Sequence, residues 1–136
     1  MLKRIDHVGV IVDDLAQARA FVESLGMELD RELDRPDLRA AFYRVGDGSM
    51  IELIEVTTDE GRRTRLGEGN TARIEHIAVE VDDLGAALPA LRGLGIDFNA
   101  PEPVAIGRNL NVWTLAETCD GVQYQFFQKN AVAPES

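Results

Sequence analysis

Cysteine and histidine are scarce in this sequence: 136 residues contain one cysteine, Cys119, and two histidines, His7 and His76. A single cysteine cannot close an internal disulfide, so nothing indicates an oxidising compartment. No apolar run approaches the roughly 20 residues that a membrane-spanning helix needs. The first residues lead straight into a strand-like segment, so we expect no signal peptide. We therefore expect a cytoplasmic protein that has no membrane partner.

Basic residues are also few, with 14 Lys and Arg against 24 Asp and Glu, and the formal net charge is −10. Such a chain is repelled on average by polyanions, so we expect no nucleic-acid partner. The composition, 45% hydrophobic and 28% charged, is that of a globular protein with a core. The length suits one domain.

The sequence does contain an internal repeat. Residues 4–27 read RIDHVGVIVDDLAQARAFVESLGM, and residues 73–96 read RIEHIAVEVDDLGAALPALRGLGI. Aligned without a gap, the two segments share 11 identities in 24 positions, among them His7 with His76 and Gly26 with Gly95. A duplicated segment of this length indicates that two copies of one structural unit build the fold.

Each copy has the pattern of a strand followed by a helix. Val and Ile dominate 5–12 and 74–81, as in strands. An aspartate pair then offers a helix N-cap, apolar residues follow at helical spacing, and a glycine ends the helix. Pro89 lies inside the second helix, so we expect that helix to begin late or to bend. Further strands are predicted at 27–33, 40–45, 50–56, 97–99, 111–115 and 122–128.

These elements predict an α+β fold of two βαβββ modules, which pair to form a curved mixed sheet around a metal-binding cleft. The chain is read as a single domain with module one at 4–57, a connector at 58–72, module two at 73–129 and a tail at 130–136. The closing strands of the two modules also align, and this alignment places Glu52 over Gln125.

Strand alternation selects four candidate metal ligands. His7 points away from Val8, Val10 and Val12, which are the more apolar set and are expected to pack under the helix. The same argument places Glu52 opposite to Ile51 and Leu53, and the repeat transfers both placements to His76 and Gln125. Two imidazoles, a carboxylate and an amide suit one divalent ion such as Zn, Ni, Co, Mn or Fe, whose identity the sequence leaves open. Glu52 is in addition the candidate catalytic base.

Several residues are candidates to bind a small-molecule substrate. Arg108, Asn109 and Asn111 form a polar run before Trp113, and Arg108 is either an anchor for a substrate carboxylate or phosphate or part of a solvated loop. Tyr43 and Met50 are either apolar walls of the site or core residues. Arg62, Arg63 and Arg65 are interpreted as a solvated connector.

The segments HVGVIVDDL, HIAVEVDDL, MIELIE and GVQYQF resemble the vicinal oxygen chelate superfamily. This group includes glyoxalase I, methylmalonyl-CoA epimerase, extradiol dioxygenases, and the fosfomycin and bleomycin resistance proteins. Within this superfamily, the sequence most resembles the members similar to methylmalonyl-CoA epimerase and glyoxalase I. The resemblance implies a homodimer and metal ligands at His7, Glu52, His76 and Gln125.

The epimerase pattern is not complete in this chain. The resemblance implies two catalytic carboxylates in the epimerases. The position of one is occupied here by Gln125, and the position of the other lies within Ala40-Ala41-Phe42, which contains no carboxylate. An amide has no useful basicity, so this chain departs from two-base epimerisation.

The sequence is compatible with three functions. The first is a metal-dependent isomerase or lyase of the glyoxalase or epimerase type, acting on a small carbonyl compound or acyl thioester. The second is a non-heme iron oxygenase that uses His7, His76 and Glu52. The third is a resistance-type module that binds a small molecule without turnover.

Overall fold

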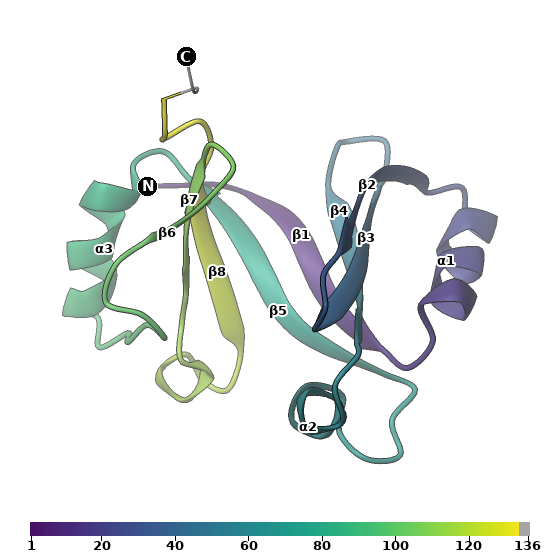
Figure 1. Ribbon diagram of the computed structural model, residues 1–136. Helices are drawn as coiled ribbons and strands as arrows, with labels where there is room; N and C mark the ends of the chain where they lie inside the picture. The colour runs from purple at the N-terminus through teal and green to yellow at the C-terminus, as the bar shows by residue number, and fades with distance from the viewer. Residues whose placement is uncertain (134–136) are drawn as a thin grey trace. The chain divides into compact units, whose positions relative to one another are not determined.

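The computed structural model describes residues 1–133 (Figure 1). The chain divides into two compact units. We call His7–Glu75 the central unit, and Met1–Asp6 together with the chain from His76 onward the terminal unit. The last three residues of the predicted tail 130–136 lie outside the described part of the chain.

The secondary structure follows the same order in each half of the chain. The first half contains β1 (Leu2–Val12), α1 (Leu15–Ser24), β2 (Glu28–Asp34), β3 (Leu38–Arg44), β4 (Met50–Val56) and the short helices α2 (Asp59–Gly61) and η1 (Arg62–Leu66). The second half contains β5 (Ala72–Val81), α3 (Leu84–Gly93), β6 (Val104–Ile106), β7 (Asn109–Trp113), the short helix η2 (Ala116–Thr118) and β8 (Gln123–Gln128).

The strands are hydrogen-bonded in the order β2-β3-β4-β1-β5-β8-β7-β6. Within this sheet β1 pairs with β4 and β5 pairs with β8 in parallel, whereas β2-β3-β4 and β6-β7-β8 are antiparallel. Each half is therefore a βαβββ module in a mixed sheet, and the α+β prediction is confirmed.

Both long helices begin and end at the residues that the repeat predicts. The side chains of Asp14 and Asp83 each accept a hydrogen bond from a backbone N–H of the first turn, at 3.2 Å. Such caps satisfy donors that the helix itself leaves unpaired. Gly26 and Gly95 follow the helices with φ of 91° and 88°, a conformation that residues with a Cβ adopt at a cost.

The expected late start of the second helix is wrong, because α3 runs from Leu84 to Gly93 with Pro89 inside it. Proline removes one backbone hydrogen bond, but the Asp83 cap fixes the first turn, and the buried Leu84, Leu88 and Leu91 hold the helix against the sheet. Within residues 1–133 no helix is long and apolar enough to cross a membrane.

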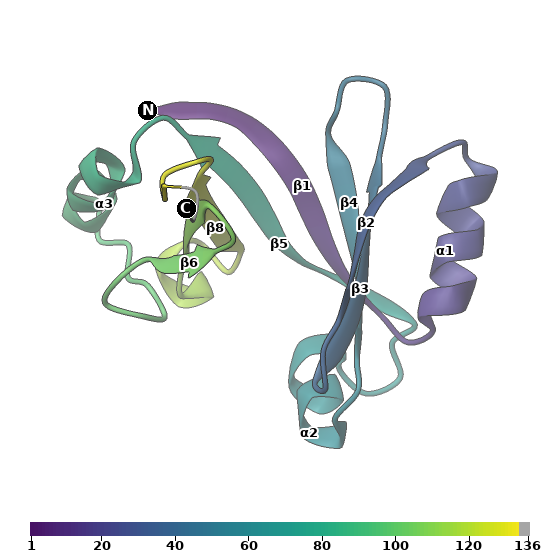
Figure 2. The ribbon, with the colours of Figure 1, turned by 45° about the horizontal axis from the view of Figure 1, so that its top comes forward.

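In the central unit, α1 packs on one face of the sheet (Figures 1 and 2). Val10 and Val12 of β1 face this helix, as do Ile51 and Leu53 of β4. On the opposite face a second cluster forms around Ile11 and includes Ala40, Ile54, Val56 and Leu66. Alternation along β4 then places Glu52 on the face that bears Ile54. The predicted parity of both strands is thus confirmed.

In the terminal unit, α3 packs on the equivalent face of its sheet. The cluster beneath it contains Val79, Val81, Leu84, Ala87, Leu88, Leu91, Val112 and Phe126. Because Phe126 faces the helix, its neighbour Gln125 on β8 faces the other side, as predicted.

The second module differs from prediction in its middle strands. The expected strand at 97–99 is reduced to a single bridge between Phe98 and Thr114. The short strand β6, which the sequence does not predict, pairs instead with β7. β6 is only three residues long, exposed throughout, and preceded by Pro101 and Pro103, so it carries neither alternation nor an apolar run.

Candidate metal centre

His7 and Glu52 lie next to each other in the central unit. His7 of β1 pairs with Met50 of β4, and Gly9, which contributes no side chain, lies directly across from Glu52. The Nε2 atom of His7 is 3.4 Å from Oε1 of Glu52, and the His7 side chain is only 5% exposed. An imidazole and a carboxylate are therefore held together where little water reaches them.

Phe42 packs against the imidazole of His7. This residue of β3 pairs with Glu52, and its ring meets the His7 ring edge-on at 5.2 Å between centroids. The guanidinium of Arg31, from β2, lies over the ring of Phe42, 3.9 Å from its centroid. Edge-to-face and cation–π contacts of this kind fix ring orientation. The side chain of His7 is thus held by packing as well as by its carboxylate neighbour.

Arg65 adds a positive charge to this part of the central unit. Its Nε and Nη2 atoms donate to the two carboxylate oxygens of Glu75, each at 2.8 Å, and Glu75 immediately precedes His76. The hydrogen bond with Glu75 raises the pKa of Arg65, and the negative charge of Glu52 contributes to the same shift. The interpretation of Arg65 as a solvated connector residue is therefore wrong.

Arg62 also has partners within the central unit. It donates to the Val56 carbonyl oxygen at 3.1 Å and forms an ion pair with Asp13. The connector is thus tied to the ends of β4 and β1, and the one-turn π-helix η1 supplies both arginines. Single π-helical turns often occur at functional sites.

In the terminal unit His76 and Gln125 share one face of the sheet. His76 of β5 is buried and pairs with Gln123, and Ala78 pairs with Gln125. The Nε2 atom of Gln125 donates to Oδ1 of Asn111 at 2.9 Å. The sequence identified Asn111 as a substrate residue and gave no sign of this contact.

His7, Glu52 and His76 carry the side-chain donors of a candidate metal site. His7 and Glu52 lie together in the central unit, and His76 belongs to the terminal unit. Two imidazoles and one carboxylate are the donors that divalent zinc, iron, cobalt, nickel and manganese accept. The residue types therefore fit a divalent ion, and joint binding of one ion by these three residues and Gln125 stays a prediction.

Two of the predicted substrate residues lie beside the candidate ligands on their strands. Met50 pairs with His7 and is half-buried. Trp113 pairs with Gln125 and is half-buried as well. Directly paired residues project to the same face of a sheet, so both side chains border candidate ligands.

The other predicted substrate residues have structural contacts. Arg108 lies in the β6–β7 turn and donates to the Val132 carbonyl oxygen at 3.3 Å. Asn109 accepts a hydrogen bond from the Asn130 backbone N–H at 3.2 Å. Both therefore hold the chain that follows β8.

Tyr43 is placed away from the candidate ligands. It is fully buried beneath α1, where its hydroxyl accepts from Arg19 at 2.8 Å and donates to Glu23 at 2.9 Å. Because Tyr43 occupies the opposite face of β3 from Phe42, the expectation that it is a wall of the site is corrected.

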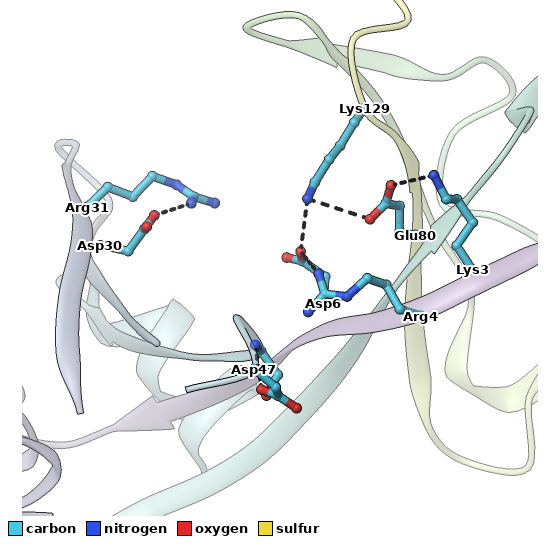
Figure 3. A network of polar contacts seen from close by, with 9 residues as sticks. Lys3, Arg4, Asp6, Asp30, Arg31, Asp47, Glu80 and Lys129 are labelled. Carbon is cyan, nitrogen blue, oxygen red and sulfur yellow. Dashed lines mark hydrogen bonds and ion pairs between the residues drawn. The ribbon is translucent and has the colours of Figure 1, made fainter. Parts of the chain in front are cut away.

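A second polar group that the sequence did not reveal lies in the terminal unit (Figure 3). The Nζ atom of Lys129 is 3.7 Å from Asp6 and 3.5 Å from Glu80, two carboxylates with side chains 5% and 9% exposed. Lys3 also pairs with Glu80 at 3.5 Å, and Arg4 pairs with Asp6 at 3.1 Å. These ion pairs tie the start of β1 to β5 and to the end of β8.

Comparison with known proteins agrees with this architecture. An uncharacterized protein of Bacillus subtilis (strain 168), YwbC, is 30% identical over 134 residues, which are 95% of this chain and all of the relative. Human mitochondrial methylmalonyl-CoA epimerase is 27% identical over 132 residues, which are 93% of this chain and 74% of the relative.

Among solved structures, methylmalonyl-CoA epimerase from Mycobacterium tuberculosis superposes with a TM-score of 0.82 at 23% identity. The match covers 98% of this chain and 90% of the other, and it shows a common fold. A family model of the glyoxalase/bleomycin resistance protein/dioxygenase superfamily matches residues 6–112. The chain therefore belongs to the glyoxalase/bleomycin resistance protein/dioxygenase superfamily.

Proposed function

We propose that this protein is a metal-dependent isomerase or lyase of the glyoxalase or epimerase type, with a small carbonyl compound or acyl thioester as substrate. The ligands are His7, Glu52, His76 and Gln125. The observation that carries the proposal is the buried His7 imidazole with its Nε2 atom 3.4 Å from Oε1 of Glu52, and the repeat adds the buried His76 as the second imidazole. Curated relatives that are methylmalonyl-CoA epimerases support an isomerase acting beside a carbonyl group.

Glu52 is the residue in this set that can move a proton. A divalent ion bound here would supply Lewis acidity to a substrate oxygen and so acidify the adjacent carbon. The carboxylate of Glu52, held beside His7, would take the proton from that carbon and return it. General-base catalysis of this kind contributes about 10²- to 10⁴-fold in rate.

The donor set favours a reaction that needs one base. Inverting a stereocentre requires proton removal on one side of the reacting carbon and delivery on the other. The residue equivalent to Glu52 in the second module is Gln125, and the residue that pairs with it is Trp113, whereas Phe42 pairs with Glu52. None of these three side chains is a base. A shift of a proton between neighbouring atoms on one face, as in a glyoxalase-type isomerisation, needs Glu52 alone.

A non-heme iron oxygenase is the second candidate function. The observation in its favour is the composition of the group His7, Glu52 and His76, since two histidines and one carboxylate make up the facial triad of such enzymes. This candidate requires iron and predicts oxygen consumption. Measurement of oxygen uptake by the iron-loaded protein with a catechol as probe separates the two functions.

We expect the protein to act on a small molecule in the cytoplasm as a homodimer. The net charge of −10 opposes binding to nucleic acid. The dimer follows from the family resemblance, and sedimentation equilibrium measures it directly.

The test is deuterium incorporation at the carbon next to a carbonyl, with methylmalonyl-CoA and a hemithioacetal of glutathione as probes. The metal-loaded wild type should exchange at least one of them, and Glu52→Gln should lose at least about 100-fold in rate while still binding metal. Glu55→Gln is the matched control, because Glu55 belongs to the same strand and pairs with Arg39 on the other face. Exchange by Glu52→Gln at the wild-type rate would contradict the proposal.

A further inference from the structure

Asn111 and Gln125 form an amide pair in the terminal unit whose orientation can be worked out. Asn111 is buried, with 4% of its surface exposed. Its Nδ2 atom lies 3.4 Å from the carbonyl oxygens of both Val104 and Asn109. Its Oδ1 atom lies 2.9 Å from Nε2 of Gln125.

Backbone carbonyl oxygens only accept hydrogen bonds, so the Asn111 atom that faces two of them is the amino nitrogen. The Asn111 oxygen then faces Gln125. Because this oxygen accepts a hydrogen bond, the Gln125 atom that faces it is the donor, the Nε2 amino group. The orientation of both amides thus follows from the fixed polarity of the backbone at β6 and β7. The carbonyl oxygen Oε1 of Gln125 is left for another partner.

We propose that Asn111 is a positioning residue that turns the amide of Gln125 so that Oε1 is presented as a metal ligand, and that it selects an amide over a carboxylate at position 125. The inference rests on the proposed metal site. This role explains why the side-chain oxygen of the buried Asn111 accepts a hydrogen bond from Gln125. Partners that orient a ligand typically affect metal affinity by about 10- to 100-fold.

The selection against a carboxylate has a direct physical cause. A glutamate at position 125 would place an oxygen about where Nε2 lies now, against the Asn111 oxygen, and two acceptors repel. Turning the Asn111 amide would relieve that contact but would face its oxygen with the Val104 and Asn109 carbonyls. The terminal unit is therefore built for a neutral ligand, and the site keeps a single carboxylate, Glu52.

The test is Co²⁺ affinity, measured by competition with a chelator, together with the visible spectrum of the bound ion. The Asn111→Leu variant, similar in shape but unable to accept a hydrogen bond, should bind Co²⁺ about 10-fold more weakly or worse, with a changed spectrum. The Gln125→Leu variant should also weaken binding, and the double variant should be no weaker than Gln125→Leu alone, because Asn111 acts only through Gln125.

The Gln128→Leu variant is the matched control. Gln128 is a glutamine on the same strand whose Oε1 accepts from the Leu84 backbone N–H at 2.8 Å, on the α3 side. It should lower thermal stability while leaving Co²⁺ affinity unchanged. An equal loss of affinity in this variant would mean that any packing change near β8 disturbs the site, and would overturn the specific role of Asn111.

A measurement on the wild type covers the case in which Asn111→Leu does not fold. In NMR spectra of the Zn²⁺-loaded protein, the side-chain amide of Gln125 should keep one hydrogen-bonded Nε2 proton with a nuclear Overhauser contact to Asn111. Loss of that contact on metal loading would overturn the inference.

The outcomes separate this inference from the function on which it rests. Unchanged Co²⁺ affinity in Asn111→Leu, with affinity lost in His7→Ala, would overturn the role of Asn111 and leave the metal site standing. Co²⁺ binding that is absent from the wild type, or indifferent to His7→Ala and His76→Ala, would overturn both.

Discussion

The two modules share one plan but surround their proposed oxygen ligands differently. In the first module the carboxylate of Glu52 has the apolar Phe42 as its paired neighbour and His7 at 3.4 Å. In the second the amide of Gln125 has Trp113 as its paired neighbour and a hydrogen bond to Asn111. The two modules thus share the backbone plan and the histidines, whereas the proposed oxygen ligands differ together with their neighbours. The comparison teaches that a carboxylate occupies this position in the first module and a hydrogen-bonded neutral amide occupies it in the second, and the proposed roles of base and neutral ligand follow this difference.

Moving the carboxylate from one half to the other should have the largest effect. We expect Glu52→Gln combined with Gln125→Glu to lose at least about 100-fold in deuterium exchange, because Asn111 opposes a carboxylate at position 125. The further change Asn111→Ser, which offers a hydroxyl donor, should recover part of that loss. The measurement is the exchange rate at equal metal occupancy, and full activity of the double variant would show that the two halves are interchangeable.

Loss of the arginine beside the first module should have a smaller effect, on stability. Arg65→Met leaves the carboxylate of Glu75 without its bidentate partner, while the aliphatic part of the side chain keeps its volume. Because Arg65 is about a third exposed to water, which screens the pair, we expect a loss of about 1 to 2 kcal/mol. Urea unfolding measures it, and Arg63→Met, in the same connector, is the control. Equal unfolding midpoints for the two variants would show that the ion pair of Arg65 with Glu75 adds no stability, as expected for a solvated arginine.

The helix caps test the features in which the two halves agree. Asp14→Ala and Asp83→Ala each remove one bond from the first turn of a helix, with equal geometry. Each change should cost about 1 kcal/mol in the free energy of unfolding, with the two values equal within about 0.5 kcal/mol. Chemical denaturation is the measurement. A much larger cost in one half would mean that the modules differ in local stability as well as in ligands.

Tyr43 gives the smallest predicted effect and concerns the first module alone. Burial raises the pKa of its hydroxyl above the ordinary value of 10.0. Above pH 10 the unfolded chain therefore releases this proton while the folded chain keeps it, so folded stability falls as the pH rises toward the folded pKa. Thermal unfolding between pH 8 and about 11 should show this decline, and Tyr43→Phe should remove part of it. An identical decline in both proteins would contradict the assignment.

Much of the fold can be predicted from the sequence because both copies of the repeat carry the same helix-capping and helix-ending residues. The aspartate pairs and the glycines Gly26 and Gly95 act in both copies as the pattern indicates. Alternation assigned Glu52 to its face, because β4 has a mixed polar and apolar pattern. On β3 the run Ala40-Ala41-Phe42-Tyr43 is apolar on both faces, so alternation could not tell Phe42 from Tyr43.

The contacts that surround the candidate ligands were not predictable. Arg65 belongs to a polar connector without periodicity, and its partner Glu75 becomes apparent only once η1 and β5 are folded. The Asn111–Gln125 pair joins residues 14 apart on different strands, and its existence depends on the register of β7 against β8. Short-range patterns carry no information on such registers when one strand has only five residues.

The central proposal is that His7 and His76, one from each module, bind the same metal ion. Elemental analysis of protein purified without chelator, in the wild type and in His7→Ala and His76→Ala separately, tests it most directly. The account predicts one divalent ion per chain in the wild type and loss of that ion in each single variant. One ion per chain that survives in either variant would contradict it.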